Sequence, residues 1–351
     1  MLDVPKKPPQ RSRDGLSERP APVTGEGPRE GFPAAAPVPT RRFELSDDGS
    51  IVVHGGAPTE EAERPPGPAA APTAPSPPRL AYRDDRRGLW LYHGNCFELL
   101  DAIAAKYPDG RFDVVFADPP YFLSNGGITC HAGKMVKVDK GGWDKSRGPE
   151  LNHEFNLEWL RRCQRVLKHN GSIWVTGTLH VIFSVGYAMQ QLGMKLLNDI
   201  AWEKPNPPPN LSCRYFTHST ETVLWAAKTE RSKHTFNYQR MRELSSGRQM
   251  KTVWTMTAPA GDEKALGKHP TQKPVALVER CLLASTNEGD SVLDPFLGGG
   301  TTAVAALRTG RRCVGIEAEA KYVNLSIARM KAEGERAWDL FAGGPSTGRS
   351  A

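Results

Sequence analysis

The sequence lacks the patterns that mark zinc proteins, secreted proteins and membrane proteins. Its six cysteines are widely separated, with no Cys-x-x-Cys pair and no histidine cluster, so we expect reduced, buried thiols and no metal site. The N-terminus has no apolar signal segment, and the chain has no run of about 18 apolar residues. These absences predict a soluble, cytoplasmic protein that does not enter a membrane.

The first 80 residues lack the apolar content that a core requires. They hold most of the 30 prolines, with many Ala, Gly and Arg residues. Such a segment buries too little apolar surface to offset its conformational entropy, so residues 1–80 are predicted to be mostly disordered. One island, residues 41–53, alternates around an Asp-Gly turn and is compatible with an isolated, marginally stable hairpin.

Charge points toward nucleic acid without deciding the question. The net charge is +7 and the pI is about 9.1. A basic balance suits a polyanionic partner, although many proteins of this charge bind none.

Strand and helix patterns alternate from residue 81 to residue 338, and a flexible tail is expected at 339–351. A polar stretch at 228–268 interrupts them, and Asn170-Gly171 is expected to end a helix. The alternation predicts an α/β domain with a mostly parallel sheet covered on both faces. Strands are expected at 89–92, 112–117, 172–176, 199–202, 221–226, 291–294 and 313–316. Helices are expected at 96–105, 155–167, 274–284, 301–307 and 322–330, and one more helix is expected to end at residue 192.

A glycine-rich turn follows the predicted strand that ends at Asp294. Gly298, Gly299 and Gly300 would let the backbone approach a ligand, and Glu317 ends the next strand, where a carboxylate binds ribose hydroxyls. The turn alone is equally compatible with a simple helix cap. A dehydrogenase is a poorer match, because the G-x-G-x-x-G spacing is not met and Asp294 would repel a pyrophosphate. The ammonium group of S-adenosylmethionine suits this carboxylate better.

A second motif, Asp118-Pro119-Pro120-Tyr121, closes an earlier predicted strand. An exocyclic amine is a poor nucleophile because its lone pair is delocalised into the ring. The carboxylate of Asp118 and a carbonyl held by the proline pair can accept its two hydrogens, and Tyr121 offers a ring for stacking. The alternative is an ordinary Pro-Pro turn with a packed tyrosine. A base in a duplex must flip out to reach such a site.

Together, the two motifs in this order resemble the β-class amino-methyltransferases of bacterial DNA. The resemblance runs from about Leu89 to Met330 and includes Lys268-His269-Pro270-Thr271-Gln272-Lys273-Pro274 and the segment 202–208. It implies a circularly permuted, Rossmann-like sheet of seven strands with a target-recognition insertion. It also implies S-adenosylmethionine as cofactor and double-stranded DNA as partner.

The resemblance assigns roles residue by residue. Asp118, Pro119, Pro120 and Tyr121 would be catalytic. The cofactor would be bound by Asn95, Asp118, Thr271, Lys273, Asp294, Phe296, Gly298, Gly300, Thr301 and Glu317. Asn95 stands where the family often has Asp, which changes the expected contact to the adenine ring, and the middle glycine of the turn replaces a common serine.

Two basic segments are candidates for DNA contacts, and solvated surface is the alternative for both. The first, residues 122–147, follows the catalytic motif, and the second, residues 228–251, lies where the family keeps its target-recognition region. The candidate residues are Lys134, Lys137, Lys140, Lys145, Arg231, Lys233, Arg240, Arg242 and Arg248.

The predicted activity is methyl transfer to the N6 amine of a flipped adenine at a specific DNA site. Asp118 favours adenine over cytosine-N4, where Ser usually replaces this residue. A protein-glutamine or RNA methyltransferase is disfavoured by the motif and its order, and a non-catalytic DNA-binding relative by the retained acid. A cognate restriction endonuclease is a candidate partner, and both a monomer and a homodimer remain open.

Overall fold

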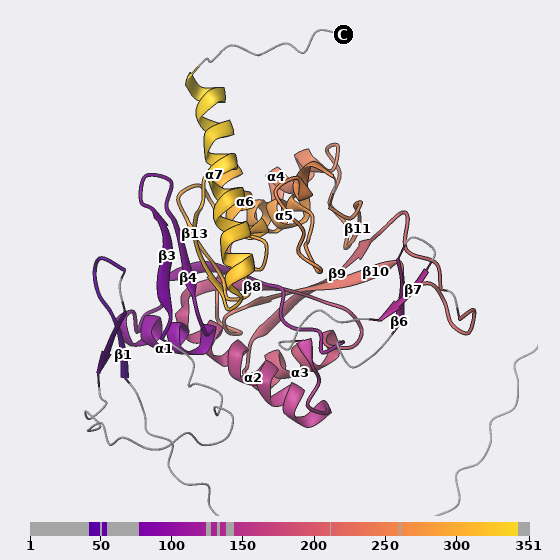
Figure 1. Ribbon diagram of the computed structural model, residues 1–351, viewed down its shortest axis with the longest axis horizontal. Coiled ribbons are helices and arrows are strands. Elements are labelled where there is room, and N and C mark those ends of the chain that lie inside the picture. The colour runs from indigo at the N-terminus through magenta and orange to yellow at the C-terminus, as the bar shows by residue number, and fades with distance from the viewer. Residues whose placement is uncertain are drawn as a thin grey trace, which may run out of the picture. The chain divides into compact units, whose positions relative to one another are not determined.

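A nine-stranded sheet carries the fold in the computed structural model (Figure 1). The structure describes residues 42–49, 51–54, 77–123, 128–131, 134–137, 144–210, 212–259 and 261–342. The order across the sheet is β11-β9-β10-β8-β5-β12-β13-β4-β3. Strands β10 and β3 run antiparallel to their neighbours, and the remaining pairs are parallel. The strands are β3 (Arg79–Asp84), β4 (Leu89–His93), β5 (Phe112–Ala117), β8 (Leu167–Gly177), β9 (Lys195–Glu203), β10 (Thr220–Ala227), β11 (Val253–Thr255), β12 (Ser291–Asp294) and β13 (Arg312–Glu317).

Helices cover both faces of the sheet and bury two apolar clusters. The group α1, α2 and α3 packs on one face, and α4 to α7 lie on the other (Figure 1). Side chains of β5 alternate between the clusters, with Val114 and Phe116 in one and Val115 and Ala117 in the other. The helices are α1 (Cys96–Lys106), α2 (Pro149–Val166), α3 (Ile182–Gln191), α4 (Tyr238–Leu244), α5 (Val275–Ser285), α6 (Thr301–Arg308) and α7 (Ala320–Ala342).

Seven strands of the sheet match the expected ones in position, and β3 and β11 extend it at its two edges. The expectation that Asn170-Gly171 ends a helix is wrong. Helix α2 ends at Val166, and both residues lie inside β8, where the pairing with β5 shifts register. The stretch 228–268 contains α4, β11 and a short 3-10 helix, Asp262–Lys264. Helix α7 continues to Ala342, into the segment expected to be a tail.

The predicted hairpin exists, but it is not isolated. Strands β1 (Arg42–Leu45) and β2 (Ile51–His54) pair antiparallel. The Tyr92 hydroxyl donates to the carbonyl of Gly49 at 2.9 Å, and Lys106 pairs with Asp47 at 2.8 Å. The hairpin thus packs against β4 and α1. The rest of the predicted disordered segment, up to residue 76, lies outside the described residues.

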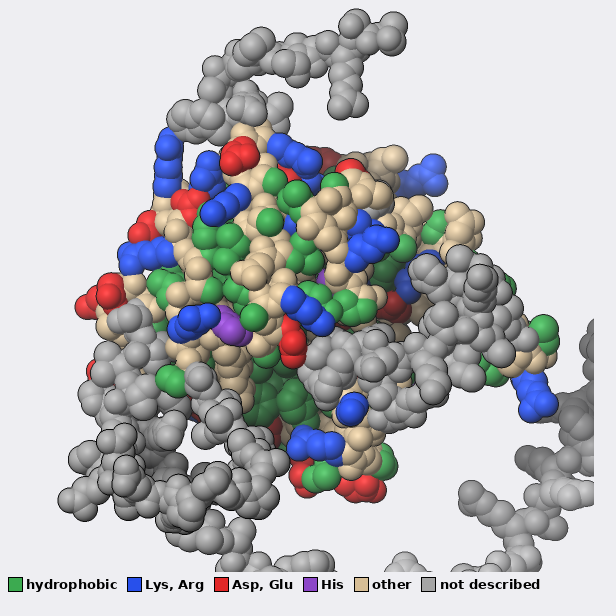
Figure 2. All heavy atoms as spheres, in the orientation of Figure 1, with side chains coloured by type: hydrophobic (Ala, Val, Ile, Leu, Met, Phe, Trp, Pro, Cys, Tyr) green, Lys and Arg blue, Asp and Glu red, His purple; other side chains and the backbone are tan. Residues whose placement is uncertain are grey.

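No helix in the described part of the chain is long and apolar enough to span a membrane. Cys96, Cys163, Cys281 and Cys313 are buried as expected, whereas Cys213 is exposed on the loop between β9 and β10. A second hairpin, β6 (Ile128–His131) with β7 (Lys134–Lys137), follows the catalytic motif. On the face shown in Figure 2, basic side chains are interspersed with acidic ones.

Candidate active site

The carboxyl ends of three neighbouring strands bring the acidic motif residues to one edge of the sheet. Asp118 follows β5, Asp294 ends β12 and Glu317 ends β13, and these three strands are parallel neighbours. Parallel strands present their carboxyl ends on the same side, where ligands of open α/β sheets bind. The two motifs, far apart in sequence, therefore belong to one site.

A cavity of about 320 Å³ opens at this edge. It is lined by every residue predicted to bind the cofactor except Gly300, and Pro120 of the catalytic motif also lines it. Phe97 and Phe155, whose ring centroids are 5.5 Å apart, form an apolar wall together with Phe296. Neither Phe97 nor Phe155 was singled out from the sequence, because apolar residues of amphipathic helices are typical core residues.

Two glycines of the turn, Gly298 and Gly300, have different structural roles. Gly298 has a positive φ of 54° and lines the cavity, and its N–H donates to Oε2 of Glu317 at 2.8 Å. Gly300 is not among the residues that line the cavity, and its predicted cofactor contact stays a prediction. It has φ of 82°, and a Cβ there would come within 3.0 Å of the Ser326 backbone. Gly300 is required for the packing of α6 against α7.

Two carboxylates on the cavity wall are buried. Burial raises the pKa of Asp294 to about 7, against hydrogen bonds from the Thr302 hydroxyl and the Phe296 N–H that favour its charged form. Burial likewise raises the pKa of Glu317 to about 7, although it accepts bonds from two backbone N–H groups. Both groups would gain from a ligand that brings a cation or hydroxyl donors.

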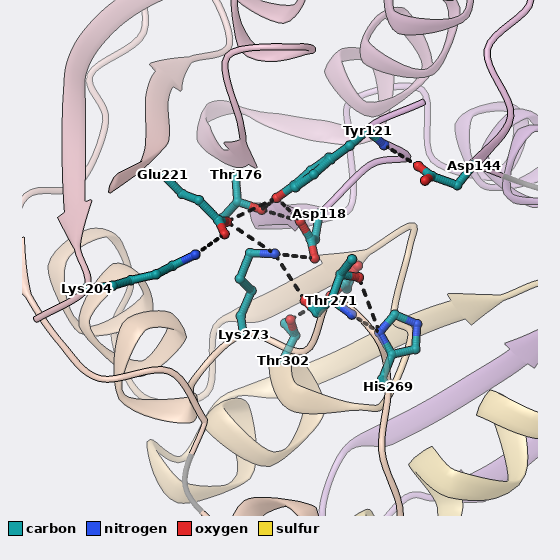
Figure 3. A network of polar contacts seen from close by, with 11 residues as sticks. Asp118, Tyr121, Asp144, Thr176, Lys204, Glu221, His269, Thr271, Lys273 and Thr302 are labelled. Atoms are coloured by element: carbon teal, nitrogen blue, oxygen red, sulfur yellow. Dashed lines mark hydrogen bonds and ion pairs between the residues drawn. The ribbon is translucent and has the colours of Figure 1, made fainter. Parts of the chain in front are cut away.

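Asp118 lies at the centre of a polar network (Figure 3). Its Oδ1 accepts the hydroxyl hydrogens of Tyr121 at 2.7 Å and of Thr176 at 2.6 Å. Its Oδ2 accepts from Nζ of Lys273 at 2.7 Å. The Lys273 ammonium thus contacts the Asp118 carboxylate, and its predicted contact with the cofactor stays a prediction. Burial and the nearby Asp118 carboxylate raise the pKa of Tyr121 well above its usual value, so its hydroxyl remains a donor.

Glu221 and Lys204 extend this network and were not predicted as site residues. Glu221, on β10, lies 3.7 Å from Nζ of Lys273 and pairs with Lys204, which follows β9 (Figure 3). Its Oε2 is also 3.4 Å from the Tyr121 hydroxyl. In sequence, Glu221 is one charged residue in an apolar strand, a pattern typical of a solvated strand face.

Asp144 fixes the backbone that follows the catalytic motif. Its fully buried carboxylate accepts the N–H groups of Tyr121, Phe122 and Leu123 at 2.9, 2.8 and 3.1 Å. Phe122 has a positive φ of 58°, which is strained for a bulky residue. The aspartate lies in a mixed-charge, glycine-rich segment, and nothing in that pattern marks it as a structural acceptor.

A second cavity of about 280 Å³ adjoins the first. Tyr121, Trp202, Lys204 and Glu221 line it, and His269, Thr271, Gln272 and Lys273 line both cavities. In the described part of the chain, Oγ1 of Thr178 and Oε1 of Gln272 are buried here without a hydrogen-bond partner. A water molecule or a polar ligand in this cavity would satisfy both atoms.

Four of the predicted DNA-contact residues lie away from this edge. Arg231 and Lys233 flank Ser232, whose hydroxyl donates to the His169 carbonyl near the start of β8. Asn237, which precedes α4, bonds to the end of α5. These contacts place Arg231 and Lys233 at the edge of the sheet formed by the amino ends of the parallel strands, away from Asp118. Helix α4, which carries Arg240 and Arg242, lies at the same edge. Lys145 is exposed beside Asp144, Lys140 lies outside the described residues, and only the backbone of Lys134 and Lys137 is described.

The profile of a protein family described as DNA methylase, with N6 and N4 specificity in its name, matches residues 112–328. The chain belongs to this family. It is 54% identical over 246 residues to the Type II methyltransferase M2.DpnII of Streptococcus pneumoniae, a match covering 70% of this chain and 90% of the relative.

Solved structures agree with this assignment. The M1.HpyAVI–SAM complex matches with a TM-score of 0.53 and 27% identity, covering 69% of this chain and 98% of that one. The cytosine-N4-specific PvuII DNA methyltransferase shares the fold, with a TM-score of 0.55 and 21% identity over 73% of this chain and 93% of that one. This chain is therefore a DNA methyltransferase that uses S-adenosylmethionine.

The larger cavity fits S-adenosylmethionine. Its wall combines aromatic rings, which would face an adenine, with two buried carboxylates. Asp294 would bind the ammonium group and Glu317 the ribose hydroxyls. When bound, S-adenosylmethionine supplies an electrophilic methyl group.

Cofactor affinity should therefore depend on pH. Because the ammonium favours ionised Asp294, binding is lost as the pH falls below the pKa of about 7. Between pH 7 and pH 5.5, calorimetry should show the Kd for S-adenosylmethionine rising at least about tenfold. The isosteric Asp294→Asn variant should bind more weakly at pH 7 and lose much of this dependence. A Kd in the wild type that stays constant over this range would contradict the assignment.

Proposed function

We propose that this methyltransferase modifies the exocyclic N6 amine of a flipped-out adenine at a specific site in double-stranded DNA. The observation that carries the proposal is the position of Asp118, which lines the cofactor cavity while its partners Tyr121 and Lys273 line the adjoining one. A base in the second cavity would present its amine between the carboxylate and the methyl donor.

The chain's own residues then act on the amine. Asp118 accepts one N–H, a carbonyl of the Pro119-Pro120 pair accepts the other, and the nitrogen becomes more tetrahedral with its lone pair directed at the methyl group. Gln272 Oε1 and Thr178 Oγ1, both buried without a partner in the described structure, offer an acceptor and a donor for the ring edge. Tyr121 and Trp202 bound the space for the ring.

The base is identified by tritium transfer. We expect label from tritiated S-adenosylmethionine to appear in N6-methyladenine after digestion of the DNA to nucleosides and chromatography. Label in N4-methylcytosine would instead support the second candidate, which uses the same chemistry and whose fold is shared with the PvuII enzyme. A 2-aminopurine at the target position should brighten on binding if the base leaves the stack.

We also propose that the loop between β9 and β10 contacts DNA. The loop leaves the sheet at the carboxyl edge, since Thr222 of β10 pairs with Gly177 at the end of β8. Its side chains Arg214, Tyr215 and Phe216 are exposed, and Phe216 is 96% exposed. A cation beside aromatic rings suits a phosphate backbone and unstacked bases.

Two exposed arginines test this placement as a matched pair. Arg214→Ala should weaken DNA binding several-fold and lower the salt slope by about one, because a phosphate contact is lost. Arg231→Ala, at the amino edge, should leave both unchanged. Fluorescence anisotropy at several salt concentrations gives the two values. If Arg231→Ala weakens DNA binding and Arg214→Ala does not, the DNA-binding surface lies in the segment 228–251 instead.

The wider setting is proposed from the relatives. The similarity to a Type II methyltransferase suggests a restriction–modification role in the cytoplasm, with a cognate endonuclease as partner. The catalytic strand β5 precedes the cofactor strand β12 in the chain, which supports a circularly permuted order.

A further inference from the structure

Lys273 takes the hydrogen-bonding position at Asp118 that a target amine would need. Its Nζ lies 2.7 Å from Oδ2 of Asp118 and 5.1 Å from the centroid of the Tyr121 ring, at the boundary of the two cavities. An amine bound for methylation donates a hydrogen to this carboxylate beside the same ring. The lysine and the amine therefore compete for one position.

The other two hydrogen-bond donors to Asp118, Tyr121 and Thr176, are poorly placed to move away from it. Asp144 accepts the backbone N–H of Tyr121 and fixes the position of that residue. Thr176 lies within β8, between paired residues of the sheet. Lys273 instead has a long side chain, and it lies just before α5 begins. Displacement at Oδ2 is thus the simplest route for the amine.

Glu221 offers the displaced ammonium another carboxylate at 3.7 Å. Burial alone would lower the pKa of Lys273, but the carboxylates of Asp118 and Glu221 raise it above its ordinary value. The Lys273 side chain is 5% exposed and its ammonium keeps its charge at neutral pH, so leaving Asp118 without a new partner would be strongly unfavourable.

We propose that Lys273 is a positioning residue that holds the Asp118 carboxylate until the target base enters and then moves its ammonium to Glu221. The exchange rests on the proposed function, and it breaks no covalent bond and transfers no proton. Lys204 stays beside Glu221 and keeps that carboxylate oriented. A base without an amine at this position gives Asp118 no replacement donor, so the exchange also selects for amino bases.

A double-mutant cycle tests the exchange by steady-state methylation kinetics. Glu221→Gln should lower kcat/KM for DNA at least tenfold, mainly through KM, because the displaced ammonium has no carboxylate to receive it. Its Kd for S-adenosylmethionine should stay within threefold of the wild type. In a Lys273→Met background, where no ammonium has to move, the same substitution should change kcat/KM less than threefold. In a Lys273→Arg background the tenfold loss should return.

An equal loss in the wild-type and Lys273→Met backgrounds would overturn the exchange, since Glu221 would then act without Lys273. Because both candidate bases carry an amine, label in N4-methylcytosine would contradict the proposed function while the cycle still tests the exchange.

Discussion

Asp118→Ala is expected to abolish methyl transfer while leaving S-adenosylmethionine bound within a few-fold of the wild-type affinity. The carboxylate accepts a hydrogen bond from the Lys273 ammonium and would accept one from an incoming amine. Its loss should lower single-turnover rates by at least about a thousandfold, which corresponds to ~4 kcal/mol of activation free energy. Rapid-quench measurement with labelled cofactor gives the rate, and calorimetry gives the affinity.

Asp118→Asn is the matched control, because it keeps the shape and one acceptor oxygen but removes the charge. It should retain more activity than the alanine variant. Survival of transfer within tenfold in Asp118→Ala, a loss below about 1.4 kcal/mol, would remove this residue from the chemistry.

The second large effect is expected at Asp144, which touches neither proposed ligand. Asp144→Ala deprives three consecutive backbone N–H groups of their acceptor and leaves the positive φ of Phe122 unsupported. Hydrogen bonds to a charged group contribute about 1.5–3 kcal/mol each, and relaxation of the loop recovers part of the loss. We expect kcat to fall at least about a hundredfold and the thermal midpoint to fall by several degrees.

Asp144→Asn should recover part of the rate, because its amide oxygen can still accept one or two of these bonds. Asp199→Ala, an exposed position on β9, should leave both the rate and the thermal midpoint unchanged. If Asp144→Ala retains the wild-type kcat, the turn after the catalytic motif does not depend on this carboxylate.

Local patterns predicted the sheet well. The β5 prediction matches the observed bounds, because a short apolar run that ends on Asp and Pro has few other interpretations. The helix stop at Asn170-Gly171 failed, because a β-bulge also favours glycine and only the pairing partner distinguishes the two. Strand β11 was missed because three residues carry no periodicity.

The site was predictable where a single segment carries the chemistry. Asp118, Asp294 and Glu317 were each expected at the end of a strand, and the structure brings these strand ends to one edge of the sheet. The contacts of Lys273, Glu221 and Asp144 join segments distant in sequence, and their side chains carry no local signal of the partner. The DNA-contact residues were predicted from the charge of two segments and from their places relative to the family's motifs. Charge does not tell one edge of a sheet from the other, and the contacts themselves stay a prediction.

The order of strands along the chain also determines when each neighbour of β5 becomes available during synthesis on the ribosome. Strand β5 has β8 on one side, which emerges soon after it, and β12 on the other, which is made near the end of the chain. At ordinary translation speeds the second edge of β5 waits on the order of ten seconds for its partner. During that time the nascent chain exposes an apolar strand edge, which invites wrong pairing and makes it a natural client for chaperones.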